Sequence, residues 1–263
     1  MQTPFKLTAI LVACSFALTA CGSSSSGRST KIEENSFGVK VSTSPKKATF
    51  DKITVDGVEI DLAKATVNAT QGNPRAVHPV FNTDSALGQA VARYNLNVKD
   101  SSLIVSTNDG SANANYVNKH NFEHVVVGAA KVNGEDYLFV QGAKSTDTPT
   151  TGTAYYTGGT LRFMDTNKDN LFQETGVLTG RIETTVDFGN KTITGFLRDP
   201  GRSATQQDFT GTLAGNSFTA TWDDKDTGKG LEGNFYGPAA TEMAGQFERS
   251  DSFGVFIAEQ KTE

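Results

Sequence analysis

Short segments of alternating apolar and polar residues fill the second half of the sequence, and this pattern constrains the fold more than any other feature. From Thr153 onward, turn residues interrupt the segments roughly every ten to fifteen positions. Such alternation is typical of antiparallel strands that bury one face. Eight strands are predicted, at Ala154–Met164, Leu178–Phe188, Lys191–Arg198, Asp208–Leu213, Ser217–Trp222, Leu231–Tyr236, Met243–Arg249 and Phe253–Glu259.

The turns and the apolar faces of these strands favour a closed barrel. Gly189-Asn190 and Gly215-Asn216 supply residues that accept the positive φ angles of tight hairpins. An even number of up-and-down antiparallel strands with one apolar face closes naturally, because closure removes exposed edges. The predicted fold class is therefore mostly β, with an eight-stranded antiparallel up-and-down barrel over residues 151–263.

A motif spans the last three predicted strands. It reads Gly-Asn-Phe-Tyr-Gly-Pro from Gly233, continues as Ala-Ala-Thr-Glu-Met-Ala-Gly-Gln-Phe to Phe247, and is followed by Phe-Gly-Val-Phe from Phe253. This segment resembles the closing strands of the transferrin-binding protein B barrel. A similar pattern closes the barrels of the neisserial heparin-binding antigen and, more loosely, of factor H binding protein. Tyr156-Thr157-Gly158-Gly159 resembles the segment that opens these barrels, so the resemblance covers roughly 110 residues.

The motif has a structural interpretation that involves no chemistry. Phe235 and Phe247 are expected to fill the barrel interior, Gly237-Pro238 to turn the chain, and Gly245 to let strands approach closely. The resemblance implies a surface lipoprotein or secreted haemophore of a Gram-negative bacterium, carried outward by a Slam-type outer-membrane translocator. It also implies a protein that binds a host factor, often one that supplies iron or haem, rather than an enzyme.

Residues 31–150 are predicted to form a β-rich handle domain that precedes the barrel. Strand character occurs at Phe37–Val41, Ala48–Leu62, Leu103–Thr107, Val125–Val127 and Tyr137–Gln141, with turn signals at Asp56-Gly57 and Asn133-Gly134. A short helix is predicted after Asp84, because Leu87, Val91 and Tyr94 would share one helical face. The polar segment from Ser145 to Gly152 indicates a linker between handle and barrel.

The N-terminus is that of a lipoprotein precursor. Lys6 precedes an apolar run that ends in Leu18-Thr19-Ala20-Cys21, a lipobox, so residues 1–20 are predicted to be a signal peptide and Cys21 the lipidated residue. A second match that ends at Cys14 leaves too short an apolar core. Residues 21–30 hold a Gly/Ser tether, and no Asp follows Cys21. Outer-membrane, surface-exposed anchoring is therefore expected.

Composition and motifs exclude several classes of function. With Cys14 removed and Cys21 acylated, no thiol remains for a disulfide, a metal site or a nucleophile. The formal net charge is −5 without a Lys/Arg stripe, which argues against nucleic acid. No nucleophile elbow, zinc-protease motif or phosphate loop is found. Asp165-Thr166-Asn167-Lys168-Asp169 opens like a calcium loop, but Asn170 and Gly176 break the pattern, so an acidic turn is expected.

All three histidines lie in the predicted handle, and they are the candidates for ligand chemistry. His78 and His120 fall in polar, turn-rich segments, where a neutral imidazole is a natural axial ligand for haem iron. His120 and His124 would stand about 13 Å apart on an extended chain, which argues against a shared metal site. A solvent-exposed position on a loop or at a strand end is the alternative role for each histidine.

Two functions stay open at this point. The first is a receptor or haemophore for haem or for an iron- or haem-carrying host protein. The second is a host-interaction lipoprotein, such as an adhesin or a binder of a complement regulator or glycan, with no role in iron uptake. Histidines that face one apolar cleft would favour the first, and scattered, solvated histidines the second.

Overall fold

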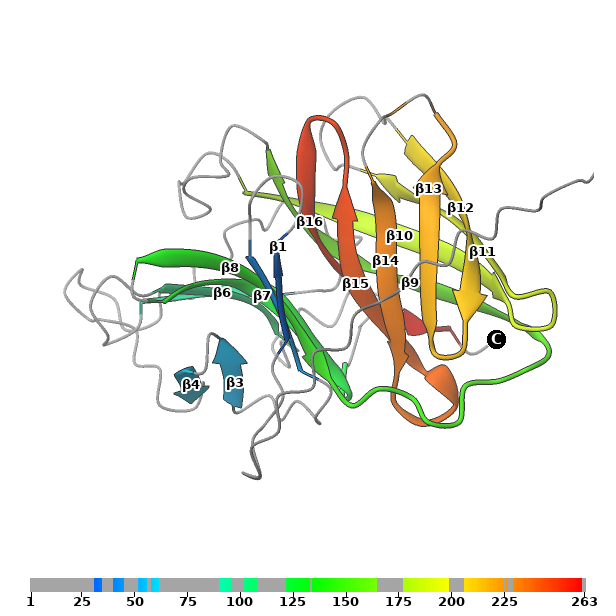
Figure 1. The fold of residues 1–263 in the computed structure, drawn as a ribbon, viewed down its shortest axis with the longest axis horizontal. Helices are drawn as coiled ribbons and strands as arrows, with labels where there is room; N and C mark the ends of the chain where they lie inside the picture. The colour runs from blue at the N-terminus through cyan, green and yellow to red at the C-terminus, as the bar shows by residue number, and fades with distance from the viewer. Residues whose placement is uncertain are drawn as a thin grey trace, which may run out of the picture.

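Eight antiparallel strands close into a barrel over the C-terminal half of the chain (Figure 1). Each strand pairs with its sequence neighbours, and β16 pairs with β9 to complete the circle. The predicted up-and-down barrel is therefore confirmed, and the strand ends lie within two residues of those predicted. The strands are β9 (Thr153–Met164), β10 (Val177–Asp187), β11 (Thr192–Arg198), β12 (Gln206–Ala214), β13 (Ser217–Trp222), β14 (Gly230–Tyr236), β15 (Glu242–Glu248) and β16 (Ser252–Gln260).

This computed structural model describes residues 31–34, 40–44, 52–55, 58–61, 90–95, 102–107, 122–132, 134–164, 177–198, 206–224, 226 and 229–261. The predicted signal peptide, tether and acidic turn at Asp165 lie outside these residues.

Aromatic side chains fill the interior of the barrel. The ring of Phe235 packs against the rings of Tyr156, Phe188 and Phe218, with centroids 5.9, 5.5 and 5.3 Å apart. Phe247 is also buried in this cluster, as the motif predicts. Glycines on neighbouring strands make room for the rings: a Cβ on Gly245 would lie 2.7 Å from the Phe256 ring and 2.0 Å from the Glu232 carbonyl oxygen. Burial of these rings is the main stabilising contribution of the barrel core.

A six-stranded sheet, here called the handle sheet, precedes the barrel. Its order is β1-β2-β8-β7-β6-β5, and every pair is antiparallel except β2 with β8. Gly134 has a φ of +85° between β7 and β8, as the predicted hairpin turn requires. The strands are β1 (Lys31–Glu34), β2 (Lys40–Ser44), β5 (Ala90–Asn95), β6 (Ser102–Thr107), β7 (Val125–Val132) and β8 (Glu135–Gly142), and a separate hairpin joins β3 (Lys52–Val55) to β4 (Val58–Asp61).

The predicted short helix is wrong where the structure describes it. Val91 and Tyr94 lie in β5, opposite Ser106 and Leu103 of β6. Valine and tyrosine favour strands, and pairing with a neighbouring strand outweighs a helical spacing that rests on only three residues. Asp84 and Leu87 lie outside the described residues.

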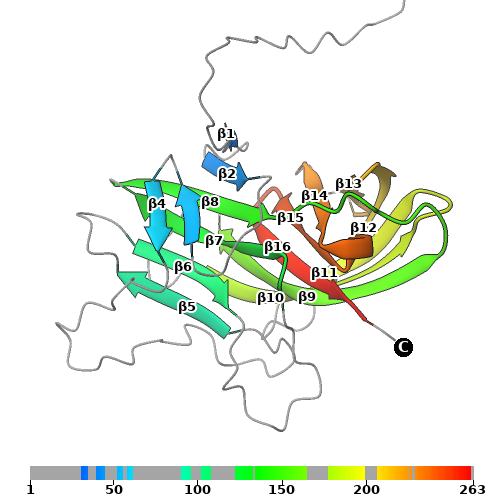
Figure 2. The ribbon, with the colours of Figure 1, turned by 90° about the horizontal axis from the view of Figure 1, so that it is seen from below.

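The handle sheet packs on the outside of the barrel, against one side only. Both views place β7 and β8 beside β15 and β16, with β11 to β13 on the opposite side (Figures 1 and 2). We call β9, β15 and β16 the covered wall, and β11, β12 and β13 the exposed wall. A second buried cluster joins the handle to the covered wall and to Tyr236. Its members are Phe122, Val125, Val127, Ala129, Leu138, Val140, Leu161, Phe163, Tyr236, Ala244, Phe253, Val255 and Ile257.

Candidate functional site

The structure describes only one of the histidines. His78, His120 and the predicted lipidation site Cys21 lie outside the described residues, so their roles stay predictions. His124 lies just before β7, at the junction of the handle and the barrel, which we call the joint. Its imidazole lies against Gly237 of the closing motif, because a Cβ built on that glycine would be 2.3 Å from His124 Cδ2.

A buried carboxylate of the barrel receives three backbone amides of the handle at this joint. Glu242 Oε1 accepts the N–H of Glu123 at 2.6 Å, and Oε2 accepts those of His124 and Val125 at 3.0 and 3.1 Å. The side chain is buried at the start of β15. Removal from water raises the pKa of Glu242 to about 7, although the three amides act in the opposite direction. The carboxylate therefore combines a structural contact with a titration near neutral pH.

The turn of the closing motif is strained and tied to the same joint. Gly237 has a φ of +72°, and Ala239 and Ala240 follow with φ of +49° and +61°, a region that costs alanine about 1–2 kcal/mol per residue. Two hydrogen bonds hold this conformation: Ala239 N–H donates to Asp147 Oδ1 at 2.9 Å, and the Tyr156 hydroxyl donates to the Ala240 carbonyl at 2.6 Å. The predicted turn at Gly237-Pro238 is confirmed.

The polar segment predicted to be a linker lies across one end of the barrel. Ser145 N–H donates to the Phe235 carbonyl, and the Asn216 side-chain amide donates to the Ser145 carbonyl. A cavity of about 440 Å³ lies beneath this segment, lined by residues such as Pro149, Phe188 and Leu213. The segment is therefore part of the barrel end.

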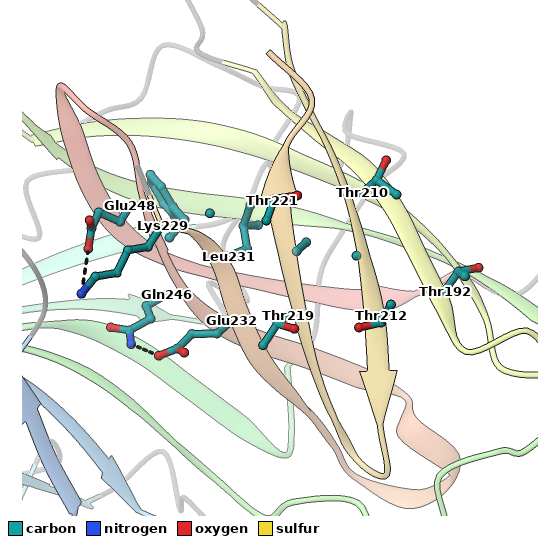
Figure 3. A pocket seen from close by; sticks show the side chains of 14 residues that line it. Thr192, Thr210, Thr212, Thr219, Thr221, Lys229, Leu231, Glu232, Gln246 and Glu248 are labelled. Carbon is teal, nitrogen blue, oxygen red and sulfur yellow. Dashed lines mark hydrogen bonds and ion pairs between the residues drawn. The ribbon is translucent and has the colours of Figure 1, made fainter. Parts of the chain in front are cut away.

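A groove of about 730 Å³ lies on the outer surface of β11 to β15 (Figure 3). Thr212 stands opposite Thr192 and Thr219, and Glu232 stands opposite Thr219 and Gln246, so these side chains form one row across five strands. Thr210 and Thr221 form a shorter row beside them. Figure 3 shows the contacts at one end of the row, where Gln246 bonds Glu232 and Lys229 lies 3.9 Å from Glu248.

The charge of the groove restricts the ligands that it suits. Its lining holds one cation, Lys229, and two carboxylates, Glu232 and Glu248. A polyanion such as a sulfated polysaccharide would meet more repulsion than attraction here. Hydroxyl and amide groups suit a neutral polar ligand instead.

Metal chemistry finds no support in the described part of the chain. No group of three or more His, Cys, Asp or Glu side chains there is placed to hold a metal ion. The described residues also include no helix that is long and apolar enough to cross a membrane.

The comparison with known families identifies the barrel. Residues 148–260 match the family of C-lobe and N-lobe beta barrels of transferrin-binding protein B. These residues form a transferrin-binding protein B-type barrel. The resemblance seen in the closing motif is thus confirmed over the whole C-terminal region.

Two curated relatives share this barrel region. The chain is 32% identical over 150 residues to the neisserial heparin binding antigen of Neisseria meningitidis serogroup B, and 30% identical over 165 residues to transferrin-binding protein B of Moraxella catarrhalis. These alignments cover 54% and 53% of this chain, but only 29% and 23% of the relatives. The chain therefore spans less than a third of the length of either protein.

The fold extends the likeness beyond the barrel. A solved transferrin-binding protein B from Haemophilus parasuis superposes on 90% of this chain and 45% of its own, with a TM-score of 0.54 and 18% identity. At that identity the likeness concerns the fold alone. Because the superposition covers 90% of this chain, it takes in handle strands as well as the barrel.

Sequence reasoning missed the role of Glu242 and the second buried face of the covered wall. No local sequence pattern indicates the role of Glu242, because its partners are backbone amides more than 100 residues away in the sequence. The wall did give a signal. Residues 253–258 form an unbroken run of apolar residues and glycine, which is typical of strands buried on both faces.

Proposed function

We propose that this protein is an outer-membrane surface lipoprotein whose handle binds a host-derived ligand, either haem or an iron- or haem-carrying host protein. The observation that carries the proposal is the transferrin-binding protein B-type barrel with a handle packed on its closing wall. The relatives are named for binding transferrin and heparin, and none of those names describes catalysis. Because aromatic rings fill the barrel interior, ligand binding falls to outer surfaces.

Haem binding is tested by spectroscopy on the purified chain that begins at Gly22. Addition of haemin should produce a Soret band distinct from that of free haem. His120→Ala should weaken or shift that band, as should His78→Ala if both residues ligate the iron, with affinity reduced at least about tenfold. His124→Ala is the matched control, since this imidazole lies against Gly237. An unchanged spectrum of haem would refute direct haem binding.

Binding to an iron-carrying protein needs its own measurement. The chain should retain iron-loaded transferrin, lactoferrin or haemoglobin on a biosensor surface, and residues 150–263 alone should not. If haem and these proteins all fail to bind, an iron-linked function is wrong.

The alternative function, a host-interaction lipoprotein without an iron role, has the groove in its favour. A row of threonines with an amide and two carboxylates suits a neutral glycan or a polar protein surface. Thr212→Val and Thr219→Val together remove two hydroxyls at nearly constant volume. On a glycan array they should abolish binding that Thr185→Val, an exposed position outside the groove, leaves intact.

Membrane anchoring is tested at the predicted lipidation site. Acyl transfer requires the Cys21 thiol, so Cys21→Ser should release the protein from membranes without changing its fold. Retention of labelled fatty acid by this variant would contradict the assignment. Protease shaving of whole cells would test surface exposure, and a comparison of cells with and without a Slam-type translocator would test the part of that translocator.

A further inference from the structure

The joint contains an anion site whose anion is a side chain of the barrel. Successive amides of a regular strand point to opposite sides, so three consecutive N–H groups converge on one carboxylate only if the chain bends. Glu123 and His124 form such a bend before β7, and their amides and that of Val125 reach Glu242. Concave rows of backbone amides bind anions. The handle thus offers the site, and the barrel supplies the charge.

The position of Glu242 on the barrel indicates that it serves the handle. Met243 points into the barrel core, so Glu242, its neighbour in the strand, points outward. Without the handle, this carboxylate would lie in solvent. The handle buries it almost completely, at 4% exposure. A buried charge without partners is costly, so the amides and the carboxylate depend on each other.

A second carboxylate of the barrel faces Glu242. Glu259 stands directly opposite on β16 and disfavours the ionised form, while Lys261 pairs with Glu259 at 2.8 Å. The handle residues Glu123 and His124 meet Glu242 through their backbone amides. Asp147, in the segment across the barrel end, accepts the Ala239 N–H in the turn that precedes β15.

We propose that Glu242 is a proton-sensitive latch that fixes the handle on the covered wall, and so acts as a positioning residue for any ligand that the handle binds. Protonation of Glu242 favours docking of the handle, because a neutral carboxyl group is far less costly to bury than a carboxylate. Burial holds the pKa of Glu242 near 7, above its ordinary value of 4.5. The docked state therefore takes up a proton more readily than an undocked state with Glu242 in water. Docking should weaken as pH rises from about 4.5 to about 7, and change no further through this group above that range.

The experiment measures amide hydrogen exchange in the chain that begins at Gly22, between pH 5 and 8, corrected for intrinsic exchange rates. Protection of the Glu123, His124 and Val125 amides should fall with rising pH in the wild type. Glu242→Gln keeps the shape of the side chain but cannot ionise, so its protection should not depend on pH. Glu242→Ala should lower protection at least tenfold at every pH.

Two controls separate the latch from other effects. Glu232→Gln changes an exposed carboxylate of the barrel and should keep the wild-type profile. His124→Gln removes the imidazole of the bend, and it should also keep the profile. Trp222, the only tryptophan, reports whether the barrel stays folded in each variant.

The proposal is overturned if Glu242→Gln retains the wild-type dependence on pH, or if His124→Gln abolishes it. It is also overturned if Glu242→Ala keeps full amide protection. None of these outcomes depends on which ligand binds, so failure of the haem hypothesis would leave this test unaffected.

Discussion

The two sides of the barrel follow different sequence rules although they share one closed sheet. On the exposed wall, β13 alternates strictly, with Phe218, Ala220 and Trp222 buried and the residues between them turned outward. On the covered wall, seven successive residues of β16, 252–258, are buried. The difference arises because the exposed wall has one apolar neighbour, the barrel core, while the covered wall also has the handle. Alternation of buried and exposed residues along a strand therefore indicates that one face is buried. A strand without alternation indicates that a second element packs on its outer face.

The closing motif has two structural roles. Phe235 and Phe247 pack inside the barrel, but Tyr236, Gly237 and Glu242 contact the handle at the joint. A motif that closes the barrel therefore also builds the surface on which the handle docks.

Removal of the handle should have the largest effect. Residues 150–263 are predicted from the sequence to fold alone, with a β-type circular dichroism spectrum and one cooperative melt. The structure adds that this fragment would expose Leu161, Phe163, Val255 and Ile257. An exposed apolar patch of this kind promotes association. The fragment should bind an apolar dye and self-associate in analytical ultracentrifugation, and a monomer that binds no dye would contradict the shared core.

A carboxylate introduced on the covered wall should destabilise the protein far more than one introduced on the exposed wall. Ile257→Asp puts an unpaired carboxylate between handle and barrel, and should lower the free energy of unfolding by at least about 3 kcal/mol. Thr194→Asp, on the exposed wall opposite Thr185 and Thr210, should lower it by no more than about 1 kcal/mol. Urea denaturation of the full chain measures both. Equal losses would mean that the two walls are alike.

Loss of a hydroxyl in the groove should have the smallest effect on stability. Thr212→Val keeps a β-branched side chain on an exposed strand, so the unfolding free energy should stay within about 0.5 kcal/mol of the wild type. A larger loss would indicate that the threonine row supports the fold.

Much of the fold could be predicted because barrel strands carry local signals. Alternation, Gly-Asn turns and the motif placed all eight strands, and the glycine of Asn133-Gly134 adopts the expected conformation. The strand at residues 90–95 was predicted as part of a helix, because Leu87, Val91 and Tyr94 fit one helical face. The joint could not be predicted, because Glu242 meets its partners only after the handle folds back. His78 and His120 keep their predicted role as candidates.

Thiol labelling tests most directly whether the handle covers the covered wall of the barrel. A chain that begins at Gly22 contains no cysteine, so a single one can be introduced at will. Val255→Cys lies beneath the handle, and Thr212→Cys lies on the exposed wall. In the folded protein a maleimide should label Thr212→Cys at once and Val255→Cys only after denaturant is added. Labelling of Val255→Cys as fast as Thr212→Cys under native conditions would contradict the account.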